Sequence, residues 1–139
     1  MSTRSSLPDS DDIRLLTEIG FLASARGDVA RAEVIFGALL LLRPDKAFAH
    51  LGLATALMNA RRPGDAATHL ATAHIPPGAD ADMVQAMHGL ALQLDGRIGQ
   101  GQRVLREVSG RPGATEAPTD GVLLARKLLG ETPSGTCLK

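Results

Sequence analysis

The sequence predicts an all-α protein built from helical hairpins. Apolar residues recur at steps of three and four, and Pro- or Gly-containing breaks separate the periodic segments. Hydrophobic residues make up 44% of the chain but aromatic residues only 2%, because the apolar content is mostly Ala and Leu. This composition suits closely packed helices and is unfavourable for a β-sandwich or barrel. The 139 residues correspond to one domain.

The breaks divide the chain into five regions. Residues 1–12 are polar and are expected to form a flexible arm, with Ser10, Asp11 or Asp12 as the cap of the first helix. A repeat domain is expected over 13–109, then a Pro/Gly linker over 110–118, a capping helix over 119–130 and a flexible tail over 131–139. The first predicted helix runs from residue 13 to the break at Gly27, and the second runs from that break to Pro44. The third and fourth are predicted over 47–59 and 66–73. The last three are predicted from Asp80 or Asp82 to 94, over 100–108 and over 122–129.

Small and large residues recur at an interval of about 34 residues. One small series is Gly20, Ala54 and Gly89, a second is Ala32, Ala66 and Gly101, and the large series is Phe36, Leu70 and Leu105. Small residues let two helix axes cross closely, and the large residue fills the space between hairpins. The pattern is typical of tetratricopeptide (TPR) repeats. It predicts about three such hairpins in a short solenoid, followed by a C-terminal helix.

The repeat pattern has two gaps. The third repeat carries Gly96, Gly99 and Gly101, and glycine weakens a helix by about 1 kcal/mol per residue. The large aromatic residue often found early in the first helix of a TPR hairpin is replaced by Leu16, His50 and Gln85. An ordinary helical bundle rich in Ala and Leu is therefore the alternative architecture.

Charge and hydropathy exclude two classes of partner. The chain has 15 basic and 15 acidic residues and a formal net charge of zero, which argues against nucleic-acid binding. The longest apolar run, residues 34–42, is much shorter than the roughly 20 residues that span a membrane. The first 12 residues lack the apolar core of a signal peptide. We expect neither a nucleic-acid nor a membrane partner.

No residue pattern predicts a catalytic, cofactor or metal site. His69 and His74 are five positions apart, whereas two metal ligands on one helix face are three or four apart. The glycines at 96–101 lack the lysine of a phosphate-binding loop and follow no strand. The single cysteine, Cys137, excludes an internal disulfide framework. The Arg61-Arg62 turn is interpreted as a solvated charge patch, with a phosphate or acidic-partner site as the alternative. We expect a protein that is not an enzyme.

A partner-binding groove is expected on the concave face of the solenoid, which the first helix of each hairpin lines. By repeat register, the groove residues are Phe21, Phe48, Leu51, Thr55, Met58, Met83, Leu90 and Leu94. This apolar, Met-containing set suits the apolar face of an amphipathic helix better than a charged peptide tail. The alternative is that some of these side chains pack against neighbouring helices or beneath the C-terminal helix.

Two segments carry a family resemblance. The stretch 15–20, with Gly27 soon after it, resembles the first helix of TPR-type needle-subunit chaperones of bacterial type III secretion systems. Leu57-Met58-Asn59 followed by Gly64-Asp65-Ala66-Ala67 is similar to the second hairpin of that family. The resemblance covers roughly residues 13–108. Translocator chaperones and other small secretion TPR proteins share the fold.

The resemblance implies a cytoplasmic bacterial chaperone. Such a protein holds the amphipathic helix of a secreted needle-type subunit in its groove and so prevents premature polymerisation, usually together with a small helical co-chaperone. Leu51, Met58 and Leu90 would be groove contacts. The linker and the helix at 122–129 depart from the family pattern, and that extension is expected either to cap the solenoid or to occupy the groove. A TPR scaffold module is the alternative function, and a homodimer is the alternative state when the client is absent.

Overall fold

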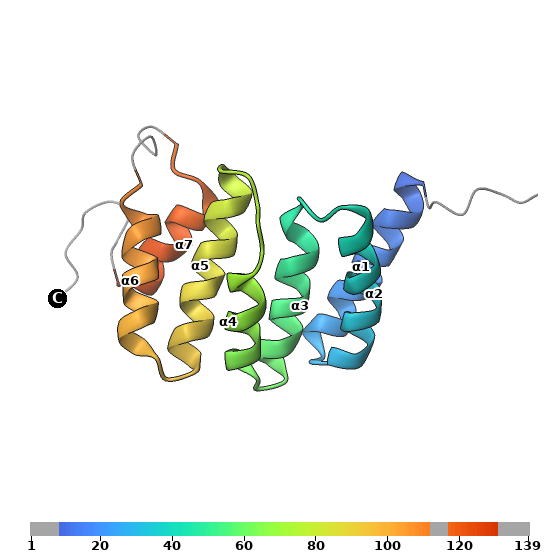
Figure 1. Ribbon diagram of the computed structural model, residues 1–139, viewed down its shortest axis with the longest axis horizontal. Helices are drawn as coiled ribbons and strands as arrows, with labels where there is room; N and C mark the ends of the chain where they lie inside the picture. The colour runs from blue at the N-terminus through green and yellow to red at the C-terminus, as the bar shows by residue number, and fades with distance from the viewer. Residues whose placement is uncertain (1–8, 112–116, 131–139) are drawn as a thin grey trace, which may run out of the picture.

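A computed structural model describes residues 9–111 and 117–130, and these residues form helices and connecting turns without strands. The helices are α1 (Ser10–Ala25), α2 (Val29–Leu42), α3 (Ala47–Asn59), α4 (Pro63–Ala71), α5 (Ala79–Leu94), α6 (Ile98–Ser109) and α7 (Asp120–Leu128). Figure 1 shows them in a row, from α1 and α2 at one end to α6 and α7 at the other. The predicted all-α class is confirmed.

The first helix begins inside the region expected to be a flexible arm. Asp9 is the cap, because its Oδ1 accepts the backbone N–H of Asp12 at 2.9 Å. In return, Oδ2 of Asp12 accepts the backbone N–H of Asp9 at 3.3 Å. This reciprocal pair satisfies two N–H groups that the helix itself leaves free, so helix geometry extends back to Ser10. Residues 1–8 of the predicted arm lie outside the described residues.

Other helix ends differ from the sequence-based boundaries by a few residues. α4 begins at Pro63 rather than Ala66, because proline at the first helical position has a suitable φ and needs no N–H partner. α6 begins at Ile98 rather than residue 100. Thr119 caps α7 as expected, and its Oγ1 accepts the N–H of Val122 at 3.3 Å. Residues 112–116 of the predicted linker and the predicted tail at 131–139 lie outside the described residues.

Closely approaching helices bury the small residues that the repeat pattern selected. A Cβ added at Gly20 would lie 2.7 Å from Cζ of Phe36, and one added at Gly89 would lie 2.7 Å from Cδ2 of Leu105. A Cβ at Gly101 would lie 2.8 Å from the carbonyl oxygen of Gly89. In each case the missing side chain is what allows the two helices to approach so closely.

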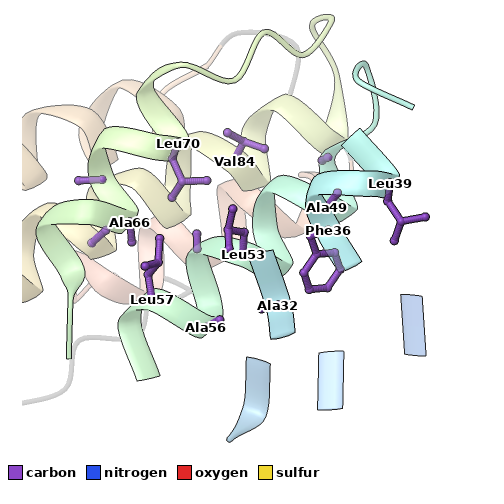
Figure 2. Packing of buried hydrophobic residues seen from close by; sticks show 14 of the residues in the cluster. Ala32, Phe36, Leu39, Ala49, Leu53, Ala56, Leu57, Ala66, Leu70 and Val84 are labelled. Atoms are coloured by element: carbon purple, nitrogen blue, oxygen red, sulfur yellow. The ribbon is translucent and has the colours of Figure 1, made fainter. Parts of the chain in front are cut away.

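The core consists of two clusters that share α5. The first runs through α1 to α5, and Figure 2 shows its buried side chains from α2, α3, α4 and α5 following one another along the interior. The second joins α5, α6 and α7 and contains Ala86, Leu105, Val108, Val122 and Ala125, all fully buried. Among the described residues, no helix combines the length and the hydropathy needed to cross a bilayer.

Candidate functional site

The central helix of the expected groove, α3, carries a row of four partly exposed residues. Phe48, Leu51, Thr55 and Met58 follow each other at steps of three and four on α3, so they share one side of the helix. All four are half-buried. The three apolar side chains pack against the first core cluster with their inner atoms and leave the remainder open to solvent. The Thr55 hydroxyl donates to the carbonyl oxygen of Leu51 at 2.7 Å.

The helices that flank α3 carry the other four predicted residues. α1 and α5 both contact α3. On α1, Phe21 is 38% exposed and packs edge-to-face against Phe36, with ring centroids 5.1 Å apart. On α5, Met83 and Leu90 are half-buried and Leu94 is 57% exposed. The structure therefore places the eight predicted residues on three adjoining helices. We call this set the apolar stripe.

The C-terminal helix covers part of α5 next to the stripe. α7 packs on both α5 and α6 and buries Ala86 beneath Val122 and Ala125. Gly121 lies directly against the backbone of Asp82, where a Cβ would clash. α7 thus closes the end of the row of helices.

Polar contacts that the sequence did not indicate fix α7 in place. Asp82 is buried, with 7% of its surface exposed. Its Oδ1 accepts from the Arg111 guanidinium at 2.5 Å, and its Oδ2 accepts from the Thr119 hydroxyl at 2.7 Å. Arg111 also donates to Oε1 of Gln85. One carboxylate thereby connects the start of α5, the second residue after α6 and the cap of α7.

Two further hydrogen bonds that the sequence did not indicate join the end of α1 to α3. The buried Ser24 hydroxyl donates to the carbonyl oxygen of Gly52 at 2.7 Å. The Asn59 amide donates to the carbonyl oxygen of Ser24 at 2.8 Å. These bonds satisfy polar groups at the end of α1, which is why a serine is tolerated in the interior.

Two histidines that are distant in sequence meet between α3 and α4. Nδ1 of His50 lies 3.2 Å from Nε2 of His69, and Nε2 of His50 lies 3.4 Å from the carbonyl oxygen of Pro44. Burial, and secondarily the neighbouring His50, lower the pKa of His69 below its ordinary value of 6.5. Within the described residues, no group of three or more His, Cys, Asp or Glu side chains is placed to hold a metal ion.

A cleft with a volume of about 460 Å³ lies over α5, between α4 and α6. Its apolar lining includes Ala71, Leu92 and Val104, and its polar lining includes His88, Arg97 and Arg103. Burial, and secondarily Arg97, lower the pKa of His88. Sequence reasoning missed this cleft because its residues come from three helices with no shared spacing.

The comparisons with known proteins add no relative. No family model matches the chain, and no curated protein or solved structure matches it.

Proposed function

We propose that this protein is a helix-binding chaperone of the TPR type, whose client is the amphipathic helix of a secreted needle-type subunit. The observation that carries the proposal is the line of half-buried Phe48, Leu51 and Met58 on α3, with further apolar side chains on α1 and α5. Side chains that rest on the core but keep one face in solvent are preorganised for contact, since binding them costs little additional conformational entropy.

The dimensions of the apolar stripe suit a client helix. Residues 48–58 extend over about 15 Å at 1.5 Å per residue. Neighbouring packed helices lie 8–10 Å apart, so the distance from α1 to α5 across α3 is about 20 Å. A client helix of about 14 residues covers that distance, and its i, i+3, i+4 and i+7 side chains supply a matching apolar face.

The repeat register supports a solenoid. Gly20 beside Phe36 and Gly89 beside Leu105 place equivalent residues of the first and third hairpins in equivalent contacts. We propose that α1–α2, α3–α4 and α5–α6 are three TPR hairpins and that α7 is the capping helix. Terminal capping elements are a general need of solenoids, whose end repeats otherwise expose a core face.

The cellular setting follows from the family resemblance of residues 15–20 and 57–67. We place the protein in the bacterial cytoplasm, where it keeps a polymerising subunit monomeric, together with a small helical co-chaperone. Burying the apolar side of the subunit helix removes the surface through which copies assemble. Each 1.4 kcal/mol of binding free energy lowers the free subunit tenfold.

The test is titration calorimetry of the full chain with the amphipathic C-terminal helix of a needle-type subunit from a type III secretion system. The control peptide has the same composition, but its apolar residues are scrambled so that no face is formed. We expect saturable binding of the first peptide alone. When this peptide is present at a hundredfold excess over its Kd, the unfolding free energy of the protein should rise by about 2.7 kcal/mol. Equal binding of the two peptides, or binding of neither, would contradict the proposal and favour a scaffold.

A further inference from the structure

α1 has an apolar side that no described part of the chain covers. Leu15, Ile19 and Leu22 are 55%, 42% and 63% exposed. The opposite side of the helix is the buried one, where Gly20 and Ser24 face α2 and α3. Figure 1 shows α1 at one end of the row of helices. Three large exposed apolar side chains on one helix face are typical of a surface that binds another protein.

Opposite charges bracket these three residues. Asp11 lies four positions before Leu15, and Arg26 lies four positions after Leu22, so all five side chains follow one side of the helix. Asp11 and Arg26 are both exposed. Asp11 and Arg26 form one pair, and Leu15 and Leu22 form another. Both pairs are centred at the same point in the sequence, between residues 18 and 19. Glu18, three positions after Leu15 and four before Leu22, lies along the edge of this face and pairs with Arg14 at 3.8 Å. The face is therefore acidic at one end, basic at the other and apolar between them, with an exposed ion pair along one edge.

We propose that this face of α1 binds the same face of a second copy, with the two helices antiparallel. A two-fold axis beside Ile19 then places Leu15 against Leu22 of the second copy, and Asp11 against Arg26 of the second copy. Every contact is made twice, as a symmetric interface requires. The antiparallel arrangement also places the helix dipoles in opposite directions.

Charge complementarity selects a second copy as the occupant. A parallel pairing places Asp11 beside Asp11 and Arg26 beside Arg26, which is repulsive at both ends. The chain has a net charge of zero, so copies do not repel each other at long range. Beside the face, a hollow of about 190 Å³ offers space for an incoming side chain, and it is lined by Ile19, Leu22, Ala23, Arg26, Asp28 and Arg31. Asp28 pairs with Arg31 at 3.0 Å, so Arg26 is the cation of this hollow that is left for a second copy.

This interface is separate from the apolar stripe. At 100° per residue, Phe21 lies roughly 160° around α1 from Ile19. A dimer formed through Ile19 therefore leaves the client-binding surface open, and the two proposals succeed or fail independently. The face involves few residues per copy, which corresponds to the small end of protein interfaces, so we expect micromolar rather than nanomolar association.

The first experiment is sedimentation velocity of the full chain from about 5 to 500 µM, the range in which such weak dimers form. We expect a monomer–dimer equilibrium in the native chain and a loss of affinity of more than about tenfold in Leu22→Glu. The melting temperature of Leu22→Glu should stay near the native value, because the side chain is 63% exposed. Leu41→Glu is the matched control, since Leu41 on α2 is 86% exposed and lies outside the proposed face.

Two further variants test the antiparallel register. Arg26→Asp alone should weaken the dimer, and Asp11→Arg together with Arg26→Asp should restore it, because opposite charges then face each other again. Ile19→Cys, in a chain whose Cys137 is replaced by Ser, should form a disulfide-linked dimer under mild oxidation, whereas Leu41→Cys should not.

The proposal has three ways to fail. It is overturned if the native chain is monomeric up to 500 µM, if Leu22→Glu dimerises as well as Leu41→Glu does, or if the charge reversal does not restore association. Met58→Glu separates this proposal from the proposed function, because it should abolish client binding and leave the dimer intact.

Discussion

The ring of Phe36 on α2 packs directly against the α-carbon of Gly52 on α3. Phe36 is completely buried, and its ring also contacts Gly20 of its own hairpin. One aromatic side chain thus joins the first hairpin to the second, and it requires a residue without a side chain on both sides.

Gly52→Ala should therefore destabilise the protein despite the higher helix propensity of alanine. The added methyl group forces the Phe36 ring to move, and overpacking of this kind costs about 1–3 kcal/mol. Gly37→Ala is the matched control on α2, because nothing lies within 4 Å of its added Cβ. That change should instead stabilise the helix by up to about 1 kcal/mol. Urea denaturation measures both, and a stabilised Gly52→Ala would contradict the packing described.

Asp82→Ala should loosen the C-terminal end of the molecule. The change leaves Arg111 and Thr119 without their buried acceptor, and hydrogen bonds to a charged group are worth about 1.5–3 kcal/mol. Hydrogen exchange should accelerate in α7 before it does in α1–α4. The control is Asp95→Ala, which breaks only the exposed pair with Arg97 and should cost less than about 1 kcal/mol. Uniform acceleration along the chain would show that Asp82 does not act locally on α7.

Met58→Glu should remove client binding at a small cost in stability. Because Met58 is half-buried, its inner atoms contribute to the first core cluster, and we expect a loss of about 1–2 kcal/mol in unfolding free energy. In the complex the carboxylate would be buried without a partner, which lowers affinity a hundredfold or more. The exposed Leu41→Glu should bind client normally. A cooperative melt combined with unchanged client affinity would place the binding surface elsewhere.

The unfolding free energy should fall as the solution is acidified below about pH 6.5. Protonation of His69 and protonation of His88 both contribute to this loss. The pKa of each is lowered in the folded protein, mainly by burial, so the unfolded chain takes up these protons first. Stability is fully present above the unfolded value of 6.5 and declines as the pH falls from there towards the folded pKa values. His69→Gln should reduce the proton uptake on unfolding by up to about one. Melting curves between pH 5 and 8.5 measure this, and an unchanged pH dependence in His69→Gln would contradict it.

Local features of this fold were predictable from the sequence, and contacts between distant residues were not. Helical periodicity and caps such as Thr119 are short-range, so the helices were placed within a few residues. The start of α1 was missed because the reciprocal pair of Asp9 and Asp12 was not recognised. Gly20 and Phe36 stand out because they recur in the repeat pattern.

Contacts between helices depend on how each helix is rotated about its axis, which spacing along one helix does not encode. Gly52, the Asp82–Arg111 pair and the His50–His69 pair were therefore invisible in the sequence. For the apolar stripe, the spacing in the sequence places its four residues on α3 along one side of a helix, and whether they bind a partner stays a prediction. It did not show that each side chain would divide its surface between the core and solvent.

Each described helix contacts only helices one or two places away in the chain. The molecule can therefore begin to form during synthesis, because no helix has to wait for a distant part of the sequence to leave the ribosome. α1 and α2 can close on α3 once residue 59 has emerged, and α5 then adds the next contact surface. Folding from the N-terminus onwards keeps each newly made apolar face exposed for only the time needed to synthesise the following hairpin.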